Sequence, residues 1–297
     1  MENKQLTPWK RFIGLLKLEV KDILQLLYYA AFGGIVALSL PLGIQAIINL
    51  IQGAQMSTSW VVLVILVTIG VLFSGALQLM QLRIIETIQQ RIFTRASFEL
   101  SYRFPKIKMN ELRNYYPPEL ANRFFDTLTI QKGLSKILID VPTALLQILF
   151  ALILLSFYHP FFIIFGILLL LLIYIVFKFT AQKGLETSLV ESKNKYKVAH
   201  WIQEIARTVV SFKLSGNTNL AMQKNDILVD NYLKARENHF KILIIQFTQM
   251  IGFKVIVTAS LLLIGGALVL NQEMNIGQFV AAEIIILLVI ASVEKLI

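Results

Sequence analysis

The residues of this sequence that could do chemistry are polar side chains placed inside long apolar runs. They are six glutamines, one asparagine and one glutamate: Gln45, Asn49, Gln78, Gln81, Gln147, Gln246, Gln249 and Glu283. A charged or polar group at bilayer depth is costly, so it usually faces the interior of a helix bundle or a water-filled path. These residues are our candidates for a substrate pathway. Glu283 is the strongest of them, because it lies about 10 Å inside the last apolar run at helical rise. For the glutamines, hydrogen bonding between helices is the alternative.

Sites for catalysis, metal or phosphate are not evident in the sequence. It contains no cysteine, and its three histidines, His159, His200 and His239, are far apart. A phosphate-binding loop requires Gly-x-x-x-x-Gly-Lys-Ser/Thr, and the dipeptide Gly-Lys does not occur. We therefore expect no catalytic residues, no metal and no bound cofactor in this chain, and no ATP hydrolysis by it alone.

The apolar runs identify the elements that must position the pathway candidates. Hydrophobic residues make up 56% of the chain and charged residues 15%, against about 25% charged residues in soluble domains. No Asp, Glu, Lys or Arg occurs in 23–82 or in 141–177, and a helix needs about 20 apolar residues to cross a bilayer. We expect an all-α polytopic membrane protein. Its six predicted spans lie at about 26–50, 60–82, 137–157, 161–177, 243–270 and 276–295, and two long helical loops cover 83–136 and 178–242.

Two features of individual spans add detail to this prediction. Pro41 falls inside the first span, where proline frees a carbonyl and bends the helix. In the second span, Gly70 and Ser74 form a pair of small residues that could let another helix approach closely. Before the first span, residues 1–25 form a cytoplasmic N-terminus, in which Thr7 to Leu24 has a basic and an apolar face. We interpret it as an interfacial amphipathic helix, and a plain extension of the first span is the alternative.

The basic residues predict the orientation in the membrane. Of 28 Lys and Arg residues, 26 fall in residues 1–22, 83–140 and 178–241. The opposite loops, near 52–59, 158–160 and 271–275, carry none. The positive-inside rule places the basic side, with the N-terminus, in the cytoplasm. Anionic lipid headgroups are sufficient partners for the net charge of +10, and we expect no nucleic acid.

Three stretches at fixed places in this topology suggest a family. The first is Gln90-Arg91-Ile92-Phe93 through Tyr115-Tyr116-Pro117-Pro118-Glu119-Leu120-Ala121-Asn122-Arg123-Phe124-Phe125-Asp126. The second runs from Gln203-Glu204-Ile205 to Lys213-Leu214-Ser215-Gly216, and the third is Asn275-Ile276-Gly277-Gln278-Phe279-Val280-Ala281-Ala282. In order and spacing they resemble the exporter-type transmembrane domain of ABC transporters over nearly the whole chain, 26–297. Pro118 stands where that family usually has Gly, and the last span lacks the family's later proline.

The resemblance implies two short coupling helices that insert into nucleotide-binding domains. The first would comprise Tyr116, Pro117, Pro118, Glu119, Leu120, Ala121, Asn122 and Arg123, and the second Val210, Ser211, Phe212, Lys213, Leu214, Ser215 and Gly216. Aromatic residues at these tips suit a protein partner, and an ordinary solvated loop tip is the alternative.

The resemblance also implies partners and a location. We expect an ABC nucleotide-binding domain that binds ATP and Mg²⁺, a second transmembrane half in a homodimer, and a bacterial inner membrane, as in peptide and type I secretion exporters. The last residues, Val293–Ile297, still look helical, so we favour a truncated chain over a membrane subunit with a separate ATPase. A membrane regulatory protein without transport activity, and a secondary transporter that uses Glu283 for protons, are the alternative functions.

Overall fold

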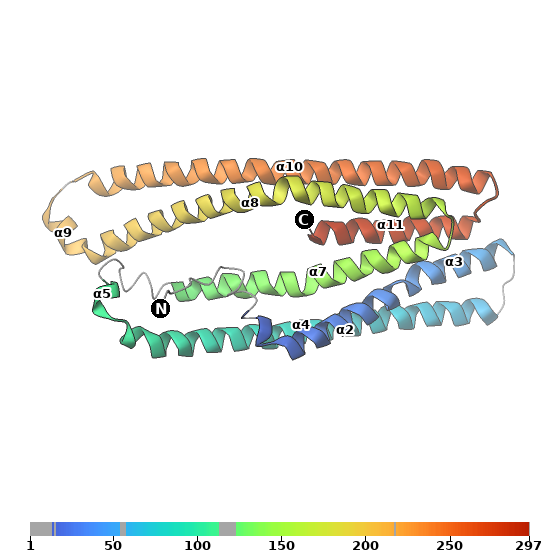
Figure 1. The fold of residues 1–297 in the computed structure, drawn as a ribbon, viewed down its shortest axis with the longest axis horizontal. Helices are drawn as coiled ribbons and strands as arrows, with labels where there is room; N and C mark the ends of the chain where they lie inside the picture. Colours follow the sequence, from blue (N-terminus) through green and yellow to red (C-terminus); the bar gives the residue numbers. More distant parts are fainter. Residues whose placement is uncertain (1–13, 15, 54–57, 113–122, 217, 297) are drawn as a thin grey trace, which may run out of the picture. The chain divides into compact units, whose positions relative to one another are not determined.

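The computed structural model describes residues 14, 16–53, 58–112, 123–216 and 218–296, and all the regular elements of this part are helices. The prediction of an all-α protein is confirmed. In chain order (Figure 1) the elements are α2 (Val20–Ala37), α3 (Ser39–Gln52), α4 (Thr58–Arg103), the 3₁₀ turn η1 (Phe104–Lys106), α5 (Met109–Leu112), η2 (Arg123–Phe125), α7 (Asp126–Ser156), α8 (Phe161–Arg207), α9 (Val209–Leu214), α10 (Leu220–Leu270) and α11 (Ile276–Leu296).

Length and composition make this a multi-pass membrane protein. Among the described residues, five helical stretches are long and apolar enough to cross a bilayer: Val20–Gln52, Thr58–Lys106, Thr127–Ser156, Leu220–Leu270 and Ile276–Leu296. The fourth predicted span, 161–177, coincides with the start of α8. The apolar stretch found there, Phe161–Leu171, is shorter than the other five. The helices α4, α8 and α10 contain 46, 47 and 51 residues. At 1.5 Å per residue they are about 70–77 Å long, more than twice the roughly 30 Å of a hydrocarbon core.

The first predicted span consists of two helices rather than one bent helix. Helix α2 ends at Ala37 and α3 begins at Ser39. Pro41 explains the break, because it has no N–H to donate to the carbonyl of Ala37 and its ring conflicts with that carbonyl. The backbone N–H of Leu38 instead donates to the carbonyl of Ile35 at 3.1 Å, which tightens the last turn of α2.

Part of the predicted N-terminal amphipathic helix, residues 7–13 and 15, lies outside the described residues. Within them, a turn at Leu18 and Glu19 precedes α2, which begins at Val20. Residues 20–24, which the sequence assigned to the amphipathic helix, therefore continue into the first membrane helix. Sequence periodicity missed this boundary because apolar spacing is helical on both sides of it.

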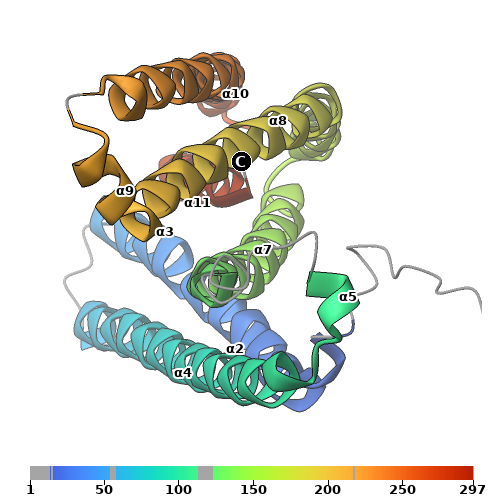
Figure 2. The ribbon, with the colours of Figure 1, turned by 90° about the vertical axis from the view of Figure 1, so that its left-hand side faces the viewer.

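The described residues form two compact units, and the first comprises the described residues up to Gly166 together with Thr258–Leu296. In it, α7 packs against α2, α4 and α11, and α3 packs against α4 and α11. Figure 2 shows α2, α4 and α7 next to one another. One buried apolar cluster joins these three helices: Leu26, Ile85, Ile88, Ile92, Leu134 and Leu138.

Small residues permit the closest helix approaches in this unit. A Cβ on Gly70 would meet the Oγ of Ser39, and a Cβ on Gly43 would meet the side chain of Val67. The prediction that Gly70 lets another helix approach closely is confirmed, and the approaching helix is α3.

The start of α11 is fixed by a reciprocal cap. The side-chain oxygen of Asn275 accepts from the backbone N–H of Gln278 at 2.7 Å, and the side-chain oxygen of Gln278 accepts from the backbone N–H of Asn275 at 3.0 Å. This capping box satisfies two donors that a helix start leaves free. The stretch Asn275-Ile276-Gly277-Gln278 therefore forms the N-terminal cap of α11.

The second unit, Ile167–Val257, contains α9 and the parts of α8 and α10 that lead to it. Side chains join these two long helices within the unit. Thr187 Oγ1 lies 2.9 Å from His239 Nδ1, and Arg236 donates to a carboxylate oxygen of Glu191 at 3.1 Å. The connection between α8 and α10 runs through α9.

Candidate functional site

The second predicted coupling segment contains the short helix α9, Val209–Leu214. Helix α8 ends at Arg207, and Thr208 forms a turn in which its hydroxyl donates to the carbonyl of Glu204 at 2.6 Å. After α9, Gly216 has a φ of +71°, a backbone conformation that glycine adopts without steric cost. The second predicted coupling segment therefore ends in a turn at Ser215 and Gly216.

The two faces of α9 differ in burial. Val210 and Leu214 are 65% and 83% exposed, and Val209 is 44% exposed. Phe212 is half-buried, and its ring lies 6.4 Å from the ring of Trp201 in an edge-to-face arrangement. The helix therefore presents an apolar outer surface and is held on its inner side by an aromatic pair.

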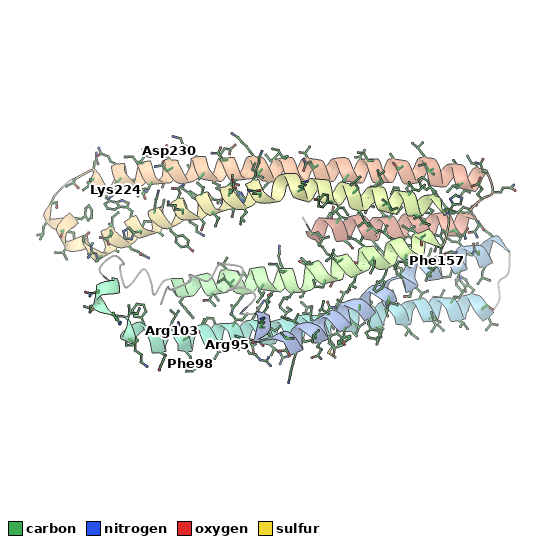
Figure 3. The ribbon with its side chains drawn as sticks, in the orientation of Figure 1. Arg95, Phe98, Arg103, Phe157, Lys224 and Asp230 are labelled. Carbon is green, nitrogen blue, oxygen red and sulfur yellow. The ribbon has the colours of Figure 1, made fainter. Side chains whose placement is uncertain are left out.

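Trp201 of α8 is a residue that the sequence reasoning missed. Its indole N–H donates to the carbonyl of Ala221 in the first turn of α10, at 3.1 Å. The ammonium of Lys224 lies over the indole, 4.1 Å from the ring centroid, and Figure 3 shows Lys224 at the α9 end of α10. The signal in the sequence was a tryptophan eleven residues before Phe212, within the charged loop 178–242.

Most of the first predicted coupling segment, residues 116–122, lies outside the described residues, and Arg123 opens the 3₁₀ turn η2. Just after it, the ring of Phe124 packs edge-to-face on Phe93 of α4, with centroids 5.1 Å apart. Phe124 also lines a hollow of about 290 Å³ with Ser97, Leu100, Ser101 and Phe104. The return of the chain from this tip to α7 is thus anchored on α4.

An ionic cluster holds the start of α2 against α4. Glu19 is only 5% exposed, and its two carboxylate oxygens accept from Arg91 and Arg95 at 3.0 Å each. Arg91 also pairs with Asp22. The hydrogen bond that Arg91 donates to Glu19, followed by the negative charge of Asp22, raises the pKa of Arg91. Because a buried carboxylate needs charged partners, this cluster fixes the chain at the entrance to the first membrane helix.

Two of the pathway candidates lie at the other end of the first unit. The hydroxyl of Tyr158 donates to the side-chain oxygen of Gln45 at 2.6 Å, and burial raises the pKa of Tyr158 to about 12. The side chain of Asn49 lies against Gly277 of α11. Gln45 and Asn49 therefore connect α3 to the α7–α8 turn and to α11.

A contact between a histidine and a carboxylate lies at the same end of this unit. His159 Nε2 lies 3.2 Å from a carboxylate oxygen of Glu273, and the backbone N–H of Phe161 donates to His159 Nδ1 at 3.2 Å. Phe157, in the same turn between α7 and α8, is marked in Figure 3. Polar contacts thus tie the turn after α7 to the turn before α11.

Another pathway candidate joins α7 to α11. The hydroxyl of Ser292 is 1% exposed and donates to the side-chain oxygen of Gln147 at 3.0 Å. Gln147 thus forms a hydrogen bond between two helices, as the alternative interpretation of the glutamines expects, and Gln45 forms one between α3 and the α7–α8 turn.

The remaining candidates lie on α4, α10 and α11, and each is described within its own unit. On α4, Gln78 is exposed and Gln81 is buried. On α10, Gln246 lies beside Gly184 of α8, and the buried side-chain oxygen of Gln249 has no hydrogen-bond partner among the described residues. Glu283 is half-buried between the buried residues 281–282 and 285–286 of α11.

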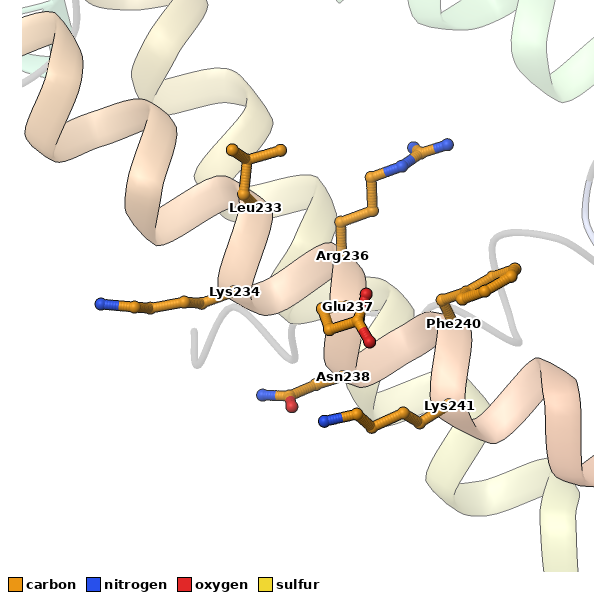
Figure 4. A pocket seen from close by; sticks show the side chains of 7 residues that line it. All are labelled: Leu233, Lys234, Arg236, Glu237, Asn238, Phe240 and Lys241. Atoms are coloured by element: carbon orange, nitrogen blue, oxygen red, sulfur yellow. The ribbon is translucent and has the colours of Figure 1, made fainter.

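Other features on the surface do not form a binding site. A hollow of about 740 Å³ on α10 is lined by seven residues between Leu233 and Lys241, all from this one helix, and Figure 4 shows their side chains pointing in different directions. A surface formed by one helix cannot enclose a ligand. In the part of the chain that the structure describes, there is no group of three His, Cys, Asp or Glu residues that could hold a metal ion.

Comparison with protein families identifies the chain. The sequence model of the ABC transporter transmembrane region matches residues 24–293. The chain belongs to this family. The resemblance inferred from the three sequence stretches is therefore confirmed, and the protein is a membrane translocation module of an ABC transporter. A search of curated proteins gave no match. Membrane regions of ABC transporters generally pair with nucleotide-binding domains.

Proposed function

We propose that this ABC transmembrane region is the translocation module of an ATP-driven exporter, and that α9 is a coupling helix bound by a nucleotide-binding domain. The ATPase domain, in the same polypeptide or in another, supplies the ATP and Mg²⁺ site and all of the hydrolysis. The first predicted coupling segment, Tyr116 to Arg123, has the same role in this proposal. Two such modules, as a homodimer in a bacterial inner membrane with cytoplasmic N-termini, enclose the pathway and alternate between inward-open and outward-open states.

The exposed apolar surface of α9 is the observation that carries the proposal. Val210 and Leu214 are largely exposed, although apolar side chains gain by leaving water. Lipid cannot cover them, because α9 lies too far from the predicted fourth span. Lys178 is the first charged residue after that span, and the 29 helical steps of α8 from Lys178 to Arg207 extend about 44 Å. A protein partner is therefore the occupant that fits, and a short helix with apolar side chains suits a groove on an ATPase domain.

The lengths of α4, α8 and α10 support the same function. Each continues far beyond the length that crosses a bilayer, and the extended parts carry the excess of basic residues that marks the cytoplasmic side. A rigid helix that extends from the tip to the membrane can carry a displacement of the tip into the span.

Crosslinking tests the assignment of α9 directly. The chain has no cysteine, so a single Leu214→Cys substitution gives a unique thiol on α9. In the intact transporter, with its ATPase domain carrying surface cysteines, we expect Leu214→Cys to crosslink to that domain and the crosslink to block ATP hydrolysis. Met222→Cys on α10, at 71% exposure, is the matched control and should crosslink far less. Equal crosslinking of both positions, or none from Leu214→Cys in an active transporter, would remove the coupling assignment.

A further inference from the structure

We propose that Trp201 is a positioning residue that fastens α9 to both long helices, so that a push on α9 moves α8 and α10 together. This inference rests on the proposed function, because it assigns a role in the transmission of force from the ATPase domain. It concerns a residue outside α9 itself and outside the surface that the partner would contact.

Three elements meet on the indole of Trp201. The residue belongs to α8, its N–H donates to the carbonyl of Ala221 in α10, and its ring packs against Phe212 of α9. The ammonium of Lys224, on the next turn of α10, lies over the ring at 4.1 Å from the centroid. A hydrogen bond, an edge-to-face aromatic pair and a cation–π contact therefore converge on one side chain, and each has the geometry typical of its class.

Helix α9 needs such an anchor because it cannot be rigid by itself. It has six residues, and helices this short are not stable in isolation. Of its apolar residues, Val209, Val210 and Leu214 are exposed, and only Phe212 is turned toward the rest of the unit. The chain after α9 passes through Gly216, the most flexible residue type. The aromatic pair with Trp201 is thus a side-chain contact that ties α9 to the long helices.

The other contacts between α8 and α10 explain why the anchor can be removed without unfolding the unit. The pairs Thr187–His239 and Glu191–Arg236 join these helices farther from the tip. Neither pair touches α9. A variant without the indole should therefore keep α8 and α10 side by side while α9 loses its fixed position.

The first measurement concerns the position of α9. Spin labels on Lys213→Cys in α9 and Asp230→Cys in α10, both exposed, report the distance between the two helices in the intact transporter. We expect a narrow distance distribution in the otherwise native protein and a broad one with Trp201→Ala. Trp201→Phe keeps a ring for Phe212 and Lys224 and should restore most of the narrow distribution. Ile202→Ala, at an exposed neighbouring position, is the matched control and should change nothing.

The second measurement concerns coupling. With Trp201→Ala we expect the kcat of ATP hydrolysis to fall about tenfold with an unchanged KM for ATP. Loss of one aromatic pair and one hydrogen bond changes the population of docked α9 by roughly that factor, whereas Trp201 lies outside any nucleotide site. A fall in the amount of folded protein alone would leave the kcat per folded transporter unchanged.

The outcomes separate the two proposals. A native-like distance distribution in Trp201→Ala would overturn the role of Trp201, whatever the crosslinking shows. Absence of the Leu214→Cys crosslink from the native transporter would overturn the coupling function, whatever the distances show. Should Trp201→Ala fail to fold, Phe212→Ala removes the same pair from the α9 side. It must then give the same broadening, and a narrow distribution there would refute the inference.

Discussion

Replacing Gly277 by alanine should destabilise the packing of α11 on α3. A Cβ at this position would lie 2.9 Å from the backbone carbonyl oxygen of Gln45 and would also meet the side-chain oxygen of Asn49. The side chain of Asn49 is exposed and can rotate away. The carbonyl of Gln45 belongs to the backbone of α3 and cannot move without shifting that helix.

Two opposing effects set the size of the change. Overpacking of a close contact costs about 1–3 kcal/mol, and the obstacle here is backbone, which favours the upper part of that range. Exchange of glycine for alanine inside a helix gains up to about 1 kcal/mol. We therefore expect Gly277→Ala to lower the free energy of unfolding by about 1–2 kcal/mol.

Unfolding of the purified protein in mixed micelles, titrated with a denaturing detergent and followed by tryptophan fluorescence, measures this difference. The matched control is Gly266→Ala in α10, because a Cβ there would have no neighbour within 4 Å. The control should be neutral or slightly stabilising. If Gly277→Ala proves as stable as Gly266→Ala, the close approach of α11 to α3 is not what requires glycine at this position.

Two further predictions concern charged and titratable groups. Glu19→Gln should lower the free energy of unfolding by about 1–2 kcal/mol, because it removes the negative charge that Arg91 and Arg95 share. This value is kept low because both arginines are about half exposed, and water weakens their attraction to the carboxylate. Glu237→Gln on the exposed face of α10 should have no effect in the same detergent titration, and equal effects of both variants would refute the role of the cluster. For Tyr158, burial raises the pKa to about 12, whereas the pKa in the unfolded chain is near 10. As the pH rises, the hydroxyl therefore loses its proton first in the unfolded state. The free energy of unfolding should fall between about pH 10 and pH 12. Tyr158→Phe should lack this part of the pH dependence, and identical pH profiles for the two proteins would contradict the effect of burial.

Several features could be predicted from the sequence because they depend on neighbours along the chain. The charge-free runs predicted membrane helices, since composition alone decides whether a helix of that length dissolves in lipid. Pro41 predicted a disturbance in the first span, and the structure has a full break at Leu38. Asn275 and Gln278 lie within one turn of each other, so the start of α11 could be located near Ile276.

Other features depend on contacts between residues that are distant in sequence, and the periodicity of apolar residues does not predict such contacts. Glu19 and Arg95 are 76 positions apart, and the acid appears in the sequence only as one charge among the basic residues of the N-terminus. Gln147 and Ser292 are separated by 145 positions. Helical spacing tells which face of a helix is apolar, but it does not tell which helix covers that face or at what height.

The sequence by itself determined that this chain is an all-α membrane protein of the ABC transmembrane family, because composition, charge distribution and the order of short motifs are properties of the linear chain. Only the tertiary structure decided which polar residues meet. It separated the expected pathway residues into pairs such as Gln45 with Tyr158 and Gln147 with Ser292. It also placed Trp201 between α8, α9 and α10, because the contacts of one side chain with three elements depend on how those helices pack and not on the spacing within any of them.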